Sequence, residues 1–408
     1  MDVEFLGGGN EVGRLGIYAA IDGQVMLFDY GLTPGEPPEY PKQAPPVNGV
    51  FLSHAHLDHS GMTPWLSGRY DVPIYATAIT QEIASLLFKD TLKIAESTGY
   101  PFPYDKIDVR QAVQNFVSIT PGQSIEVDSL YVTSHSSGHI PGSVMFEVED
   151  SGVLFACDIN TIDTRLLRGA RPVKSDVLFL EGTYSGQEHP PRTELERTFL
   201  DTVDEVVASG GKAIVPAFAV GRSQEIAMIL RDCGHDVWLD GMGSRVADIF
   251  LRHPQYVRSA GDLKKAMDGL RVVYSRRGRE LALQGDVIIT TSGMLNGGPV
   301  LGYVEAIRND PQSAIILTGY QVEGTNGRRL LEYGEIEMYG LTQRVNCQVH
   351  FFDFSAHAGH SQLVSFARSC SPDTVVIFHS DNPEPLAEEI RDFASAVHLP
   401  KNEERLAI

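Results

Sequence analysis

The stretch Gly49-Val50-Phe51-Leu52-Ser53-His54-Ala55-His56-Leu57-Asp58-His59 decides the fold and chemistry expected of this chain. Its apolar beginning predicts a short buried strand. Residues two apart on an extended chain face the same way, so His54 and His56 can bind one ion together. Asp58 and His59 follow where the chain turns, within reach of a second ion. Because imidazole nitrogens and carboxylate oxygens suit zinc, four such groups in six residues predict a metal site rather than a polar loop.

The size and composition of the chain indicate an intracellular protein with two domains. Its 408 residues exceed the usual single-domain length. Four separated cysteines without a Cys-x-x-Cys pair predict reduced thiols of a cytosolic protein: Cys157, Cys233, Cys347 and Cys370. No apolar run is long enough to span a bilayer, and residues 1–6 read as a strand without a signal sequence. We therefore expect a cytoplasmic location and no membrane partner.

The net charge of −20 argues against a general attraction to nucleic acids or anionic membranes, but leaves room for a locally basic cleft. Arginine outnumbers lysine by 24 to 9, and arginine binds phosphate oxygens bidentately. The candidates for phosphate contacts are Arg222, Arg276-Arg277-Gly278-Arg279 and Arg328-Arg329. Solvated surface arginines are nevertheless the commoner case.

Hydrophobic patterning changes along the chain. Short strands in the first half are expected at 25–28, 50–52, 129–133, 143–148, 153–156 and 177–180, with a helix at 80–96. From about residue 192, strands and helices alternate: helices at 194–208, 223–231 and 244–251, and strands at 213–220, 237–240, 287–291 and 314–318. This alternation predicts a parallel α/β sheet. Strands at 345–354 and 374–379 follow, with helices at 361–369 and 385–396.

Several further metal-binding side chains stand at the ends of expected strands. Asp29 follows 25–28, Asp158 follows 154–157, and His379 follows 375–378. His139 lies in the glycine-flanked loop 137–143. A ligand at the exit of a rigid strand is held most accurately, so we expect these side chains to converge with the His54–His59 run.

The order of these groups resembles the metallo-β-lactamase superfamily. Asp29 matches its first motif, the His54–His59 run the second, His139 the third and Asp158 the fourth. The resemblance implies an αββα sandwich holding two zinc ions. It assigns His54, His56 and His139 to the first ion, Asp58 and His59 to the second, and Asp158 to both. Asp29 would orient a ligand imidazole from behind.

The middle of the chain is similar to the β-CASP nucleases of that superfamily. The matching segments are 179–184 (motif A), 215–225, 291–295, 318–325, 354–357 (motif B) and His379 (motif C). The closest resemblance is to archaeal relatives of the cleavage and polyadenylation specificity factor endonuclease, in a short form without N-terminal KH domains because the first strand begins at residue 2. It implies a metallo-β-lactamase domain at 1–190 and 345–408, with a parallel-sheet β-CASP domain inserted at 191–344.

The resemblance also assigns roles to single residues. His379 would complete the second zinc site, and Glu181 would hold His357 as the proton donor to the leaving ribose oxygen. Asp58, Glu181 and His357 are thus the expected catalytic residues. Arg222, Ser292 and Gly293 are expected to contact the substrate. A histidine at motif C accompanies RNA substrates in this family, so His379 favours RNA.

Together these features predict a di-zinc ribonuclease that cuts single-stranded RNA internally, in mRNA 3′-end processing or in RNA maturation or decay. Manganese or iron could replace zinc, because ligand type alone does not select the metal. A 5′→3′ exoribonuclease of the RNase J type is the alternative within the same chemistry. A catalytically inactive RNA-processing subunit is the alternative from another class, although such relatives lose ligands that this chain keeps. The expected protein partners are a second copy of the chain and RNA-processing or exosome-type proteins.

Overall fold

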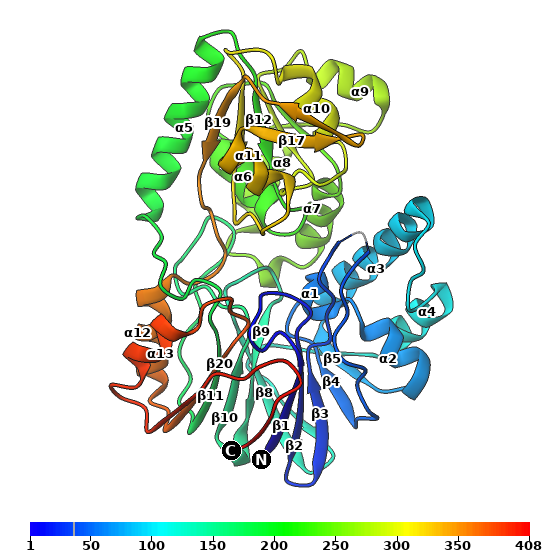
Figure 1. Ribbon diagram of the computed structural model, residues 1–408, viewed down its shortest axis with the longest axis vertical. Coiled ribbons are helices and arrows are strands. Elements are labelled where there is room, and N and C mark those ends of the chain that lie inside the picture. Colours follow the sequence, from blue (N-terminus) through cyan, green and yellow to red (C-terminus); the bar gives the residue numbers. More distant parts are fainter. Residues whose placement is uncertain (36) are drawn as a thin grey trace. The chain divides into compact units, whose positions relative to one another are not determined.

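The computed structural model describes residues 1–35 and 37–408. Its contacts divide the chain into two compact units (Figure 1). Unit 1 comprises Met1–Asp163, Arg168–Glu188 and His357–Ile408, and unit 2 comprises Thr164–Leu167 and His189–Ala356. Both units combine helices with sheets, which confirms the predicted α/β class. Among the described residues, no helix combines the length and apolar character needed to cross a membrane.

Unit 1 contains two seven-stranded sheets. The first has the order β22-β1-β2-β3-β4-β5-β6. Its strands are β1 (Asp2–Gly7), β2 (Gly16–Ile21), β3 (Gln24–Phe28), β4 (Gly49–Phe51), β5 (Ile74–Thr77), β6 (Phe116–Ile119) and β22 (Arg405–Ala407). β1 to β3 pair antiparallel, whereas β3 to β6 are parallel. The parallel strands therefore end at one edge, where the His54–His59 run begins.

The second sheet has the order β21-β20-β11-β10-β9-β8-β7. Its strands are β7 (Ser124–Val127), β8 (Leu130–Ser136), β9 (Val144–Val148), β10 (Val153–Ala156), β11 (Val177–Glu181), β20 (Thr374–Phe378) and β21 (Ala396–His398). A 3-10 turn, η1 (Glu149–Ser151), joins β9 to β10. β10, β11 and β20 are parallel, with Ala156 beside Leu180 and Glu181 beside Phe378. Asp158, Glu181 and His379 consequently lie at the same sheet edge.

The two sheets pack face to face through a phenylalanine-rich core. The ring of Phe155 stacks on those of Phe28 and Phe179, with centroids 3.6 and 4.4 Å away. Helices cover the outer faces: α1 (Leu57–Ser60), α2 (Thr63–Tyr70), α3 (Ala78–Thr98) and α4 (Lys106–Asn115) on the first sheet, and α12 (His360–Cys370) and α13 (Glu384–Ile390) on the second (Figure 1). The four layers form the predicted αββα sandwich, and burial of such a core is the main favourable contribution to folding.

Unit 2 is built on a six-stranded parallel sheet with the order β14-β13-β15-β12-β16-β19. Its strands are β12 (Ala213–Pro216), β13 (Val237–Asp240), β14 (Arg271–Val272), β15 (Val287–Thr290), β16 (Ala314–Leu317) and β19 (Gln348–Phe351). β12, β13, β15 and β16 are buried along their whole length. Continuous burial is typical of a parallel sheet covered on both faces.

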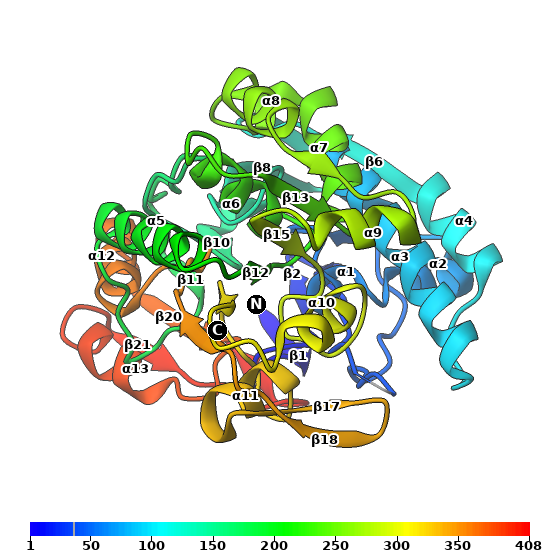
Figure 2. The same ribbon diagram turned by 90° about the horizontal axis from the view of Figure 1, so that it is seen from above.

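Helices cover both faces of this sheet. α5 (Arg192–Ala208) and α6 (Arg222–Leu230) pack on one face, and α10 (Val300–Ile307) and α11 (Asn326–Tyr333) on the other (Figure 2). The unit also contains α7 (Gly243–Arg252), η2 (Pro254–Tyr256), α8 (Ala260–Asp268), α9 (Arg276–Ala282) and the hairpin β17 (Glu335–Met338)–β18 (Leu341–Arg344). Alternate residues of β12 enter the two cores: Ala213 and Val215 face α5, whereas Ile214 faces α10.

Two expectations from the sequence need correction. The strand expected at 345–354 was assigned to the second part of the first domain, but β19 pairs in parallel with β16 and belongs to unit 2. Its hydrophobicity predicts a strand without indicating which sheet it joins. The helix expected at 385–396 ends at Ile390, and the chain then extends into β21 beside β20.

Candidate metal centre

The His54–His59 run leaves β4 and turns into α1. His56 is the N-cap of this helix, and its carbonyl accepts hydrogen bonds from the amides of His59 and Ser60. Asp58 and His59 therefore lie in the first helical turn. The segment packs so closely on Gly31 that a Cβ atom there would lie 1.7 Å from the Asp58 carbonyl oxygen. Only glycine fits at position 31, because any side chain there would clash with the backbone of Asp58.

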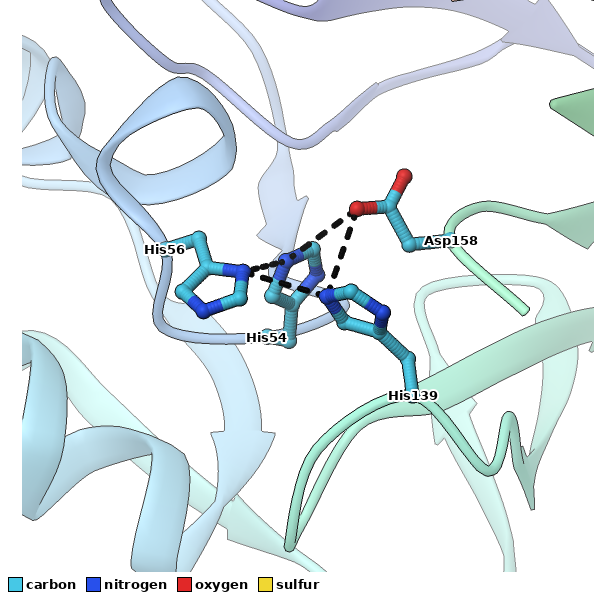
Figure 3. Close-up of side chains that lie close together, drawn as sticks. All are labelled: His54, His56, His139 and Asp158. Atoms are coloured by element: carbon cyan, nitrogen blue, oxygen red, sulfur yellow. Dashed lines mark hydrogen bonds and ion pairs between the residues drawn. The ribbon is translucent and has the colours of Figure 1, made fainter. Parts of the chain in front are cut away.

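A first group of potential ligands gathers His54, His56, His139 and Asp158 (Figure 3). The Nδ1 atom of His56 lies 3.1 Å from Nε2 of His54 and 3.1 Å from Nε2 of His139. The Oδ2 atom of Asp158 lies 3.6 Å from Nε2 of His54 and 3.5 Å from Nε2 of His139. The side chains thus converge from three separate parts of unit 1.

The loop that carries His139 owes its shape to glycine. Gly138 has φ +71, and a Cβ atom there would lie 2.3 Å from the carbonyl oxygen of Asn160. The amide of Ile140 donates to Oγ of Ser143 at 3.1 Å, which closes the loop. The position of His139 is therefore set by backbone contacts on both sides of it.

A second group shares Asp158 with the first and contains His59 and His379. Nε2 of His59 lies 3.3 Å from Oδ2 of Asp158, and Nδ1 of His379 lies 3.4 Å from Oδ1. Oδ2 of Asp58 lies 3.9 Å from Nε2 of His59 and 3.8 Å from Nε2 of His379. The structure thus brings together every residue that the sequence analysis nominated as a metal ligand.

The donor atoms fit zinc in both chemistry and spacing. Atoms around one tetrahedral zinc ion lie about 3.3 Å apart, because each bond to nitrogen or oxygen measures about 2.0–2.1 Å. Nε2 of His59 and Oδ1 of Asp158 are also buried, without a hydrogen-bond partner in the part of the chain that the structure describes. Unsatisfied buried polar atoms are costly, and a bound cation would satisfy both.

The charges within this cluster perturb one another. Burial lowers the pKa of His54 well below its usual value, and the neighbouring His59 adds to the effect. Burial opposes the charged form of His59 too, but the carboxylates of Asp158, Asp58 and Asp29 raise its pKa well above the usual value. For Asp158, burial is outweighed by His59, His357 and His379, so its pKa is lowered well below normal. The carboxylate is therefore charged at neutral pH.

Asp29 lies behind the candidate ligands and contacts one of them. Its Oδ2 atom accepts a hydrogen bond from Nδ1 of His59 at 2.8 Å. The amide and hydroxyl of Ser53 also donate to Asp29, both at 2.7 Å. The Ser53 hydroxyl in turn lies 3.0 Å from Nδ1 of His54. Asp29 thereby orients the imidazole of His59 so that Nε2 points toward Asp158, as outer carboxylates of metal sites do.

Glu181 and His357 form a pair beside Asp158, in which the glutamate side chain is fully buried and that of the histidine is 18% exposed. Oε1 of Glu181 lies 2.9 Å from Nδ1 of His357, and Nε2 of His357 lies 3.8 Å from Oδ2 of Asp158. Burial alone would lower the pKa of His357, but Glu181 and Asp158 raise it to about 9. The amides of Ile159 and Thr183 also donate to Glu181, which fixes the carboxylate. Glu181 thus stabilises the protonated form of His357.

Three groups that are not among the site residues predicted from the sequence position these side chains. Besides Ser53, the amide of Gly13 donates to Nε2 of His379 at 3.0 Å, and Oγ1 of Thr183 lies 3.5 Å from Nδ1 of the same histidine. Ser53 could have been found from its place beside His54. The Gly13 contact comes from a loop between β1 and β2, far away in sequence, and no local pattern indicates it.

The expected substrate contacts Arg222, Ser292 and Gly293 all lie in unit 2. Arg222 is mostly buried and donates through Nη1 to the carbonyl of Thr318. The hydroxyl of Ser292 is buried without a hydrogen-bond partner among the described residues, and the Gly293 carbonyl accepts from Gln321 at 3.3 Å. Arg328 and Arg329, also considered from the sequence, form ion pairs with Glu332 and Glu335.

Most of the chain matches three known protein families. Residues 16–217 match the metallo-beta-lactamase superfamily, residues 223–330 the Beta-Casp domain, and residues 342–400 the Zn-dependent metallo-hydrolase RNA specificity domain. A solved structure of a protein of unknown function from Enterococcus faecalis has a TM-score of 0.63, with 15% identity over 100% of this chain and 99% of its own. At that identity the likeness shows the fold alone.

Three curated relatives of the chain come from archaea. The chain is 34% identical to "Probable RNase MJ4" of Methanocaldococcus jannaschii, over 97% of this chain and 96% of that protein. It is 36% identical to "RNase aCSPSF2" of Saccharolobus solfataricus, over 100% and 85%. It is 32% identical to "Transcription termination factor FttA" of M. jannaschii, over 98% and 70%. The chain therefore belongs to the β-CASP ribonuclease family of the metallo-β-lactamase superfamily.

Proposed function

We propose that the protein is a two-metal ribonuclease that hydrolyses internal phosphodiester bonds of single-stranded RNA. One observation carries this proposal: two groups of ligand atoms share the carboxylate of Asp158, and the Glu181–His357 pair lies beside them. A pair of ions held in this way is the usual arrangement for in-line displacement at phosphorus. Two findings support RNA as the substrate. Residues 342–400 match the RNA specificity domain of Zn-dependent metallo-hydrolases, and two relatives are named as ribonucleases.

The proposed ligand assignment follows the two groups. His54, His56 and His139 would hold one zinc ion, His59 and His379 the other, and Asp158 both. Asp58 would join the second ion, because its Oδ2 atom lies 3.9 Å from Nε2 of His59 and 3.8 Å from Nε2 of His379. When bound, the ions would polarise a phosphoryl oxygen and bring the pKa of a water molecule toward neutrality. Asp29 would keep His59 in the tautomer whose Nε2 is available, because its carboxylate accepts the Nδ1 proton.

His357 would supply the proton for the leaving ribose oxygen. Its Nδ1 proton is engaged by Glu181, so the proton on Nε2 is the one presented on the side of Asp158. Glu181 stabilises the imidazolium before transfer and fixes the ring during it. A positioned acid of this kind contributes about 10²- to 10⁴-fold to the rate.

In unit 2, the unsatisfied hydroxyl of Ser292 and the backbone of Gly293 would contact the RNA. Arg222 would act indirectly, by fixing the loop after β16 through its bond to Thr318. In cells, we propose a cytoplasmic homodimer that acts in 3′-end formation or in RNA maturation or decay, with other RNA-processing proteins as partners. The relative named as a transcription termination factor supports a role at RNA 3′ ends.

The test uses purified protein of measured metal content and two uniformly labelled RNAs, one with a blocked 5′ end. Internal products from both RNAs, lost in Asp58→Ala, would support the proposal. Cleavage of the unblocked RNA alone would indicate 5′→3′ exonuclease action instead. RNA binding without cleavage, in protein that contains two metal ions per chain, would indicate an inactive processing subunit.

A further inference from the structure

The segment from β14 into α9 of unit 2 is locally basic in an acidic protein. Residues 271–280 contain four arginines and one carboxylate, Glu280, whereas the whole chain carries a net charge of −20. Two of the arginines are already engaged. Arg271 lies 3.2 Å from Asp236, and Arg279 lies 2.7 Å from Asp240. The other two, Arg276 and Arg277, are exposed and form no hydrogen bond or ion pair with any residue that the structure describes.

An aromatic side chain accompanies these arginines. Tyr274 is 88% exposed, more than any other large hydrophobic residue described. Its neighbours hold it in place: Val273 is buried and its amide donates to the Leu239 carbonyl. Ser275 caps α9 by accepting a hydrogen bond from the Gly278 amide at 3.1 Å. The ring is therefore presented to solvent on an ordered backbone, where its face is available to stack on a base.

The segment is fixed to the edge of the sheet where ligands of parallel sheets usually bind. Arg279 and the Tyr303 hydroxyl both bond Oδ2 of Asp240, the last residue of β13. Asp240 is paired with Thr290 of β15, and Ser292 and Gly293 follow two and three residues later. The basic segment and these expected substrate contacts thus belong to one carboxyl-terminal edge of the sheet of unit 2.

We infer that Tyr274, Arg276 and Arg277 form a binding element for single-stranded RNA, in which the tyrosine ring stacks on a base and the two guanidinium groups bind backbone phosphates. The inference rests on the proposed ribonuclease function and adds a contact outside the metal centre. A phosphate ligand alone would explain the arginines but not the exposed ring. Stacking on an aromatic side chain is tolerant of sequence, because every base has a π-face.

The test measures binding of a fluorescent oligouridylate to the full-length chain carrying Asp58→Ala, which keeps the RNA intact. Combined Arg276→Ala and Arg277→Ala changes should weaken binding and reduce the slope of log affinity against log salt by about 1.4, the value for two phosphate contacts to a single strand. Tyr274→Ala should weaken binding about 5- to 150-fold, and Tyr274→Phe should restore it, because the ring alone is needed.

The matched control is Arg328→Ala with Arg329→Ala, which removes the same charge from a helix of the same unit. These arginines are neutralised by Glu332 and Glu335, so affinity and salt slope should not change. Equal losses in both double variants would mean a general charge effect and overturn the inference. Competition by polyglutamate as strong as by RNA, with no effect of Tyr274→Ala, would indicate an acidic-peptide site and overturn it too.

The two proposals fail differently. If the unmodified chain cuts RNA and the Tyr274 and Arg276/Arg277 variants bind RNA as tightly as their parent, only the present inference is wrong. If the metal-loaded chain neither cuts nor binds RNA, the ribonuclease proposal itself is wrong.

Discussion

The carboxylate of Asp29 accepts a hydrogen bond from Nδ1 of His59 at 2.8 Å, and both residues are fully buried. Asp29→Asn should lower metal affinity and activity by about 10- to 100-fold. Three donors converge on the carboxylate, so a carboxamide must turn its NH₂ group toward at least one of them. Metal content after dialysis and the cleavage rate measure the effect. Asp150→Asn, at an exposed carboxylate in η1, is the control; equal losses in both variants would contradict this role.

The proton-donor role of His357 predicts a selective defect. His357→Ala should lower kcat by about 10²- to 10⁴-fold with metal content unchanged. An RNA in which sulfur replaces the leaving ribose oxygen should be cut by this variant at nearly the wild-type rate, because a thiolate leaves without a proton. Asp158→Ala should lose activity on both substrates. If the sulfur substrate does not rescue His357→Ala, the histidine has another role.

Removal of the metal should affect stability as well as activity. Prolonged chelation should abolish cleavage and lower the melting temperature, because ions that bind only the folded state stabilise it. Added zinc should restore both. His135→Ala makes a useful control, since His135 pairs with Glu147 at 2.7 Å outside the ligand groups. Full cleavage activity in protein shown to contain no metal would contradict the proposed function.

The ion pairs of Glu4 should make a pH-dependent contribution to stability. Burial alone would raise the pKa of Glu4, but its bonds to Lys42 and Arg405 lower it below the usual value. A carboxyl group whose folded-state pKa is lowered stabilises the protein above its unfolded-state pKa, and loses this effect as the pH falls through the folded-state pKa. Wild type should therefore exceed Glu4→Gln in urea resistance near neutral pH.

The advantage of wild type over Glu4→Gln should be about 1 kcal/mol or less, because both cationic partners are largely exposed to solvent. It should disappear in acid, below the pKa of the folded carboxyl. A difference in the free energy of unfolding that stays constant from neutral to acidic pH would show that the carboxyl charge is not its source.

The sequence was sufficient for the fold class because motif residues stand directly at strand ends. His54, Asp158 and His379 each follow a short apolar run. The structure brings them together where strands of the two sheets of unit 1 end. It was insufficient where the answer depends on which sheet a strand joins. The residues of β19 predict a strand but not its neighbour, and its pairing with β16 arises from packing remote in sequence.

The sequence does not determine the role of each arginine either, because its charge alone does not show which residue it contacts. Arg222 is buried against Thr318, and Arg328 and Arg329 are paired with glutamates, whereas Arg276 and Arg277 remain solvated. Arginine therefore fixes a loop at one position, forms surface ion pairs at others, and is a candidate RNA contact at Arg276 and Arg277. Positions of neighbouring carboxylates, set by the folded chain, decide between them.

The parallel pairing of β11 with β20 has a consequence for synthesis on the ribosome. β11 ends at Glu181, but its neighbour β20 begins at Thr374, after the whole of unit 2. In a nascent chain, His357 and His379 can therefore reach the ligands that are synthesised earlier only after the final segment has been made. Unit 2 is complete before that point. Arrested chains that end before Thr374 should resist proteolysis within unit 2 while failing to retain zinc.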